Sequence, residues 1–212
     1  MTTVIYTSTY IYQWVTVTAP VVRTDDLHKL PDNLPIPLDD GACNHLTGAR
    51  LPPISLPSTG DRMIDLSNIH GNVVIYCYPR TGKPDKDVPP GWNDIPGARG
   101  CTPQSCAFRD HYQELRALNS NVFGLSTQTT DYQKEMVARL HLPFEVLSDA
   151  QLKFSQALRL PTFTVQTMTL IKRLTLIARG ATIIKVFYPI FPPQKNVDDV
   201  ITWLSDNRSV RP

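Results

Sequence analysis

The chain has 212 residues, of which 42% are apolar, and its formal net charge is +2. These values are typical of one globular domain with an extension. The small charge predicts neither nucleic acid nor an anionic membrane surface as a partner. No apolar run approaches the roughly eighteen residues that a membrane span requires. Four cysteines are too few for a disulfide scaffold and favour a reducing, cytoplasmic compartment.

The first 34 residues are predicted to form an N-terminal extension, followed by one domain over residues 35–212. Met1–Val22 has no charged residue and is rich in Thr, Val, Ile and Tyr. It lacks the basic start of a secretory signal and favours an extended, β-prone conformation. Such a segment can add to a sheet edge or pair with a second copy, so a homodimer is one expectation. No candidate site residue lies in residues 1–34, and we expect these residues to be dispensable for the chemistry.

Hydrophobic patterns after the extension predict a proline-rich linker over residues 31–57 and then alternating strands and helices. The predicted strands cover 72–78, 121–127, 144–147, 170–178 and 181–188, and the predicted helices cover 101–118, 131–140, 150–158 and 197–205. The loop over 79–100 is unusually long, as functional or disordered loops are. A βαβ unit followed by a strand, a helix, a hairpin and a helix indicates an α/β fold of thioredoxin-like order, with a mixed central sheet flanked by helices.

Two cysteines five residues apart, Cys101 and Cys106, are the most informative feature of the chain. A helical pattern begins beside them, with Thr102 as the expected N-cap and Pro103 at the first helical position. Backbone N–H groups and the helix dipole at such a position favour an anion, and therefore the nucleophilic thiolate of Cys101. Cys106 follows about one and a half turns later, placed to capture whatever Cys101 becomes.

The same cysteines also fit two other interpretations, a pair of buried core residues or half of a zinc site. A zinc site requires closer cysteine pairs and further ligands at matching spacing. Cys43 and Cys77 are isolated, and none of the five histidines shows ligand spacing. We therefore expect no metal and no other cofactor. Cys77 is expected to be a core residue, and Cys43 a surface thiol or a second resolving partner.

Several short motifs surround the two cysteines. They are Tyr78-Pro79, Gly100-Cys101-Thr102, Phe108-Arg109-Asp110, Phe123-Gly124-Leu125-Ser126, Pro143-Phe144, Leu147-Ser148-Asp149 and Lys172-Arg173-Leu174-Thr175-Leu176-Ile177. Together they resemble the peroxiredoxins of the bacterioferritin-comigratory, or PrxQ, type over about three quarters of the chain. The cysteine segment carries the most specific part of this resemblance.

The resemblance implies a thiol peroxidase that reduces hydrogen peroxide or organic hydroperoxides, with thioredoxin or a similar dithiol as reductant. It assigns Cys101 as the peroxidatic cysteine, Cys106 as the resolving cysteine and Arg173 as the active-site arginine. It places substrate contacts on four residues: Tyr78, Pro79, Gly100 and Thr102. An arginine beside the sulfur would stabilise the thiolate and the oxygen that leaves when the O–O bond breaks. Without the resemblance, Arg173 reads as a solvated cation on a strand.

The chain departs from the family pattern before Cys101. Ala98 stands where the family usually has a Thr or Ser hydroxyl that holds the peroxide, which leaves Thr81 or Thr102 as a source. Pro79 is the better equivalent of the family's proline, which implies an insertion that carries Trp92. The long loop either shapes a site for a bulkier substrate or forms an ordered surface flap. Two alternative functions follow, a different redox or cyclisation reaction on a larger molecule and a redox sensor without turnover.

Overall fold

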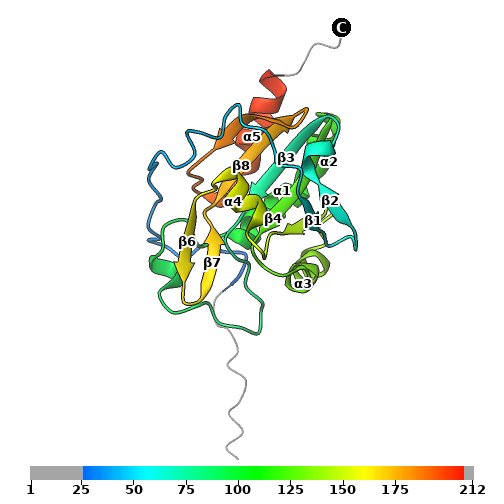
Figure 1. Cartoon of the computed structure of the whole chain (residues 1–212). Coiled ribbons are helices and arrows are strands. Elements are labelled where there is room, and N and C mark those ends of the chain that lie inside the picture. The colour runs from blue at the N-terminus through cyan, green and yellow to red at the C-terminus, as the bar shows by residue number, and fades with distance from the viewer. Residues whose placement is uncertain (1–25, 208–212) are drawn as a thin grey trace, which may run out of the picture.

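The structure is a computed structural model that describes residues 26–207 (Figure 1). The predicted β-prone segment Met1–Val22, and its pairing with a sheet edge or a second copy, lie outside the described residues. Within residues 26–207, no helix has the length and apolar character needed to span a membrane.

A five-stranded mixed sheet forms the centre of the molecule, in the order β5-β4-β3-β8-β9 (Figure 1). Its strands are β3 (Asn72–Cys77), β4 (Ser120–Ser126), β5 (Val146–Ser148), β8 (Leu174–Arg179) and β9 (Thr182–Phe187). Strand β4 pairs in parallel with β3 and β5, whereas β8 is antiparallel to β3 and β9. The predicted α/β fold with a mixed central sheet is confirmed.

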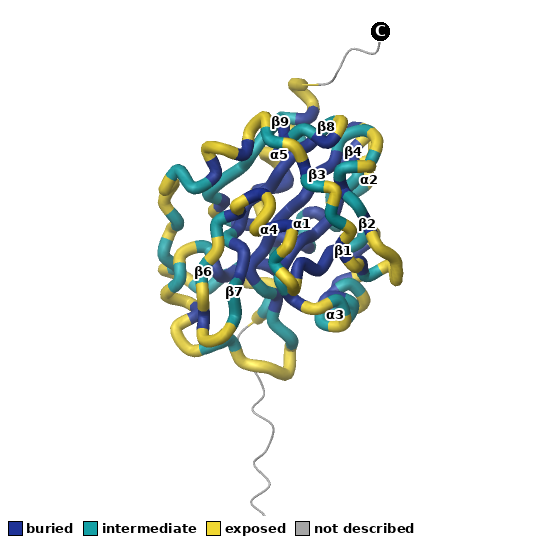
Figure 2. Tube along the Cα trace, in the orientation of Figure 1, coloured by how far each residue is buried: buried dark blue, intermediate teal, exposed yellow. Residues whose placement is uncertain are grey.

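Strand β3 supplies side chains to two separate hydrophobic cores, because successive side chains point to opposite faces of a strand. Val73, Ile75 and Cys77 belong to one core, and the residues between and after them belong to the other. The strand is buried on both faces, as its nearly continuous apolar run predicts. Figure 2 shows this buried centre surrounded by more exposed helices and loops.

Helices cover both faces of the sheet, unequally. The core on one face contains residues of α1 (Cys101–Asp110), α2 (Tyr112–Ala117), α3 (Thr130–Leu140) and α5 (Asn196–Asp206). The core on the other face contains residues of α4 (Lys153–Leu158) and of a hairpin formed by β1 (Ser55–Pro57) and β2 (Met63–Asp65). A second small hairpin consists of β6 (Thr162–Val165) and β7 (Met168–Ile171). Within residues 26–207 there are also three short 3-10 helices: η1 (Leu66–Asn68), η2 (Trp92–Asp94) and η3 (Pro193–Lys195).

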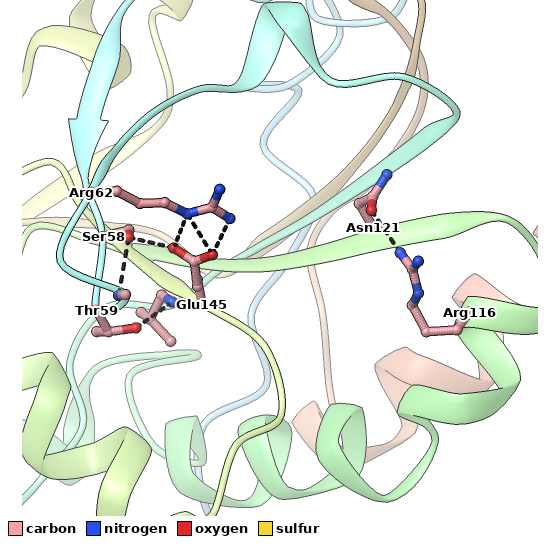
Figure 3. Close-up of polar contacts among 8 residues, drawn as sticks. Ser58, Thr59, Arg62, Arg116, Asn121 and Glu145 are labelled. Carbon is pink, nitrogen blue, oxygen red and sulfur yellow. Dashed lines mark hydrogen bonds and ion pairs between the residues drawn. The ribbon is translucent and has the colours of Figure 1, made fainter.

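Charged and hydroxyl side chains fix the β1–β2 hairpin to the edge of the sheet (Figure 3). Arg62, in the turn of the hairpin, donates from Nε to both carboxylate oxygens of Glu145, at 3.0 and 3.2 Å. The hydroxyl of Ser58 donates to the same carboxylate, and the hydroxyl of Thr59 accepts from the backbone N–H of Val146 at 3.0 Å. These bonds hold the hairpin beside β5.

Three predictions about the elements are wrong. The stretch 31–57 is not simply a linker, because Leu46, Leu51 and Leu56 are buried in the core. The predicted strand 170–178 is divided between β7 and β8, so that Arg173 lies between two strands. The predicted helix 101–118 is interrupted at His111 and divided into α1 and α2.

The start of α1 also differs from the expected cap at Thr102. The N-cap is Gly100, with a left-handed φ of 95°, and Cys101 is already the first helical residue. A Cβ atom placed on Gly100 would lie 2.6 Å from Cγ of Pro193 and 2.9 Å from Cδ2 of Leu30. Glycine is therefore required twice, for its backbone conformation and for the close approach of two neighbouring segments.

We expect Gly100→Ala to lower the free energy of unfolding more than Gly48→Ala does. Gly48 has a similar φ of 87°, but no atom lies within 4 Å of the position its Cβ would take. Both variants carry backbone strain, so their difference measures the overpacking, about 1–3 kcal/mol. Urea denaturation of the two variants measures this difference. Equal losses of stability would contradict the close packing at Gly100.

Candidate active site

Cys101 is buried at the start of α1 beside an arginine. Its side chain is only 3% exposed. Its Sγ atom lies 3.1 Å from Nη2 of Arg173 and 3.7 Å from the carbonyl oxygen of Ala98. At this distance an N–H group of the guanidinium donates a charge-assisted hydrogen bond to the sulfur.

Arg173 is buried to the same degree as Cys101, so its interpretation as a solvated strand cation is wrong. Its Nη2 group points to the turn that precedes the helix and donates to the carbonyl oxygens of Gly97 and Arg99, at 3.2 and 2.9 Å. Its Nη1 group donates to the side-chain oxygen of Gln104. These bonds hold the guanidinium against the sulfur, so a loop, a helix and the β7–β8 connection together build the site.

A buried polar network behind the guanidinium was missed by the sequence analysis. Nε2 of Gln104 donates to Oδ1 of Asn196 at 3.1 Å, and the hydroxyl of Thr175 donates to the same oxygen at 2.7 Å. Gln104 lies three residues after Cys101 on α1, and residues at this spacing share a helix face. That spacing could have indicated Gln104 from the sequence. No local pattern could have indicated Asn196 and Thr175, because they come from α5 and β8.

A small cavity of about 30 Å³ opens beside Cys101. A single water needs about 10–15 Å³ by this measure, so the cavity has room for a peroxide group. Its lining includes the basic side chains of Lys29, Arg80 and Arg99 and, among the described residues, no acidic one. The side chains that line the cavity therefore carry a surplus of positive charge.

The four predicted substrate-binding residues lie in two places. Gly100 and Thr102 line the cavity, whereas Tyr78 and Pro79 are buried and are not among its lining residues. Thr81 lines the cavity as well, and its hydroxyl donates to Oε1 of Gln128 at 3.1 Å. Ala98 has no hydroxyl, so Thr81 and Thr102 are the hydroxyl-bearing residues among those that line this cavity.

The long loop before α1 is ordered and packs on the β6–β7 hairpin. Trp92 is buried and its ring centre lies 6.3 Å from that of Phe163 in β6. Val165, Leu170 and Ala98 belong to the same hydrophobic cluster. Residues 95–97 of the loop also line a second cavity of about 220 Å³ together with Arg173. The loop is thus anchored as an ordered flap is, and a site for a bulkier substrate stays a prediction.

The other three cysteines differ in their surroundings, although all four are free thiols. Cys77 is a core residue, as predicted, and burial raises its pKa. Cys43 is also in the core, where burial raises its pKa to about 12, so its prediction as a surface thiol is wrong. Cys106 is half-buried on the second turn of α1, and burial raises its thiol pKa as well.

The last residues of the predicted N-terminal extension lie against the site. Leu27 and Lys29 line the cavity beside Cys101, and Nδ1 of His28 lies 3.9 Å from Sγ of Cys106. The expectation that residues 1–34 contain no site residue is therefore wrong. These contacts join segments more than seventy residues apart in the chain, which no local pattern reveals. Across the described part of the chain, no group of three or more His, Cys, Asp or Glu side chains is placed to hold a metal ion.

Comparison with known proteins supports the resemblance seen in the sequence. Residues 46–201 match the Redoxin family. The chain is 28% identical over 158 residues to chloroplastic peroxiredoxin Q of Sedum lineare, covering 74% of this chain and 76% of that protein. It is 34% identical over 104 residues to peroxiredoxin bcp1 of Schizosaccharomyces pombe, covering 48% of this chain and 46% of that protein.

The fold is also similar to a solved structure, the peroxidoxin BcpB of Mycobacterium tuberculosis. The TM-score is 0.62 at 23% sequence identity, over 77% of this chain and 98% of that one. The fold is thioredoxin-like, and its buried cysteine–arginine pair lies at the start of α1. The chain belongs to the Redoxin family, and within it to the peroxiredoxins of the PrxQ, or bacterioferritin-comigratory, type.

We expect Arg173→Ala to slow the reaction of Cys101 with peroxide about ten- to a hundredfold, because the 3.1 Å contact between Nη2 and Sγ is lost. This range corresponds to the loss of one charge-assisted contact of roughly 1.5–3 kcal/mol. Peptide mass spectrometry of Cys101 after a single addition of peroxide measures the rate. Lys172→Ala is the matched control, since Nζ of Lys172 pairs with Asp40 at the surface, at 2.7 Å. Equal rates for all three proteins would show that Arg173 does not promote the reaction of Cys101.

Proposed function

We propose that Cys101 is the peroxidatic cysteine of this thiol peroxidase and that Arg173 activates it. The observation that carries the proposal is the distance of 3.1 Å between Sγ of Cys101 and Nη2 of Arg173, in a buried site beside a cation-lined cavity. The proposed substrates are hydrogen peroxide and organic hydroperoxides, since the cavity has room for the O–O group they share.

In the first step the thiolate of Cys101 attacks the terminal oxygen of the hydroperoxide. The S–O bond forms as the O–O bond breaks, and Cys101 becomes a sulfenic acid. The departing oxygen leaves with the electron pair and takes up a proton to become an alcohol or water. Arg173 stabilises the thiolate before the attack and the negative charge on the leaving oxygen during it. Thr81 and Thr102 supply the hydroxyl groups that hold the peroxide in place of Ala98.

In the second step Cys106 resolves the sulfenic acid as an intramolecular disulfide. Both cysteines belong to α1. Residues five apart on an α-helix have Cα atoms about 8–9 Å apart, whereas a disulfide requires about 4.4–6.8 Å. The first turns of α1 must therefore unwind before the S–S bond forms. Thioredoxin or a similar dithiol then reduces the disulfide and restores both thiols.

Unwinding the start of α1 breaks identifiable side-chain bonds. Gln104 loses its bonds to Arg173 and Asn196, and Ser105 loses its 3.2 Å hydrogen bond with the hydroxyl of Tyr76. Local opening of this kind requires much less free energy than global unfolding. The proposed cycle thus alternates between a helical state that reacts with peroxide and an unwound state that reacts with the reductant.

We also propose that residues 35–212 form the catalytic domain and that the preceding residues are an extension whose end lies against it. The four free thiols support a reducing compartment such as the cytoplasm. Cys43 and Cys77 take no part in the proposed cycle, because both are buried in the core on the face of the sheet opposite to the core that contains Cys101.

We expect Cys101→Ser to abolish peroxide reduction, because a serine hydroxyl does not ionise near neutral pH and is a far weaker nucleophile. Peroxide consumption with a thioredoxin system measures the effect. Cys43→Ala is the control and should keep the wild-type rate, provided that its circular dichroism spectrum is unchanged. Consumption at the wild-type rate by Cys101→Ser would refute the assignment.

We expect Cys106→Ser to react once with peroxide but to fail in turnover with a dithiol reductant. Its Cys101 sulfenic acid, having no partner, should also be oxidised further to the sulfinic acid more readily than in the wild type. Peptide mapping of the oxidised wild type should show a link between Cys101 and Cys106. A disulfide that joins two chains, or one through Cys43, would show that Cys106 is not the resolving residue.

A further inference from the structure

We propose that His28 is a general base that removes the proton from the Cys106 thiol. The inference rests on the proposed resolving role of Cys106 and adds a residue from the N-terminal segment to the reaction. The inference is based on the distance of 3.9 Å between Nδ1 of His28 and Sγ of Cys106, which is within hydrogen-bonding range for a sulfur atom.

The position of His28 is fixed by its neighbours in the chain. The backbone N–H of His28 donates to Oδ1 of Asp26 at 2.8 Å, and that of Lys29 donates to the carbonyl oxygen of Asp26 at 3.3 Å. On either side, Leu27 lines the cavity of Cys101 and Leu30 packs against Gly100. A turn held at both ends against the start of α1 thus places the imidazole over the second turn of the helix.

The resolving thiol requires a base. Burial raises the pKa of Cys106, and the nearby carboxylate of Asp110 acts in the same direction. Arg109 and Arg139 oppose the shift without cancelling it. Asp110 is itself engaged with Nε of Arg109 at 2.8 Å, which leaves the imidazole as the group placed to accept the proton. A neutral imidazole has one ring nitrogen that can accept a proton, which suits this role.

Resolution then proceeds by a proton transfer followed by attack of one sulfur on the other. Nδ1 of His28 accepts the thiol proton, and α1 unwinds with Cys106 as a thiolate. The thiolate sulfur attacks the sulfur of the Cys101 sulfenic acid, so that the S–S bond forms and the S–O bond breaks. The leaving hydroxide takes a proton and becomes water, while His28 returns its proton to the solvent. The peroxide has taken two electrons from the protein in all, and the protein now holds one disulfide in place of two thiols.

The first test measures the thiol itself and needs no peroxide. In a Cys101→Ser background, peptide mass spectrometry follows the alkylation of Cys106 by iodoacetamide at several pH values. We expect His28→Gln to slow this alkylation at neutral pH and to move its rise to higher pH. In His28→Ala, added imidazole should restore part of the rate, which a purely structural role of His28 would not permit. His70→Gln, at an exposed histidine before β3, should match the parent protein.

The second test measures disulfide formation with Cys101 intact, after one equivalent of hydrogen peroxide. We expect His28→Gln to form the Cys101 sulfenic acid, trapped by dimedone, at the wild-type rate. Disulfide formation should be about a hundredfold slower, the lower part of the range for a positioned general base. Failure of the wild type to form the sulfenic acid would refute the proposed function instead. Unchanged alkylation, or unchanged disulfide formation, in His28→Gln would overturn the role of His28.

Discussion

The site depends on one buried charge, the guanidinium of Arg173. An isolated charge in a protein interior is strongly unfavourable unless it is paired and hydrogen-bonded. Here the pairing comes from backbone carbonyl oxygens of the turn before α1, from Gln104 and from the sulfur of Cys101. The arginine therefore holds the turn and the helix start together. In the proposed cycle, oxidation of the Cys101 thiolate to a neutral sulfenic acid weakens the contact that orders the helix start.

In the proposed cycle, α1 is held tightly at first and then opens. Side-chain bonds from Gln104 and Ser105 attach its first turns to α5 and to β3. Yet its N-cap, Gly100, makes no side-chain hydrogen bond, and the helix ends at Asp110 after ten residues. Proline at position 103 adds no backbone donor to the first turn. The start of the helix thus relies on contacts with the sulfur and its surroundings more than on its own backbone.

Two segments outside the central fold close the site. The loop over 79–100 is anchored by Trp92 on the β6–β7 hairpin, and the turn at 26–30 lies over both cysteines. The loop contributes Arg80 and Arg99 to the cavity beside Cys101, and the turn contributes Lys29, so both segments add positive charge around a space of about 30 Å³. A small, cation-lined cavity suits a peroxide group.

The sequence by itself determined the features that depend on local periodicity and local chemistry. The buried strand β3, the helices α3 and α5, the β8–β9 hairpin and a cysteine at a helix start all follow from spacing within a few residues, because backbone geometry sets those periods. Tertiary structure decided the rest. The contacts of the site join residues that lie 69 to 92 positions apart in the chain. They are the bonds of Gln104 with the buried Arg173 and with Asn196, and the contact of His28 with Cys106. The burial of Leu46 and Leu51 could not be predicted for the same reason. The proline-rich stretch has no hydrophobic periodicity, and only its packing against the sheet buries these two side chains.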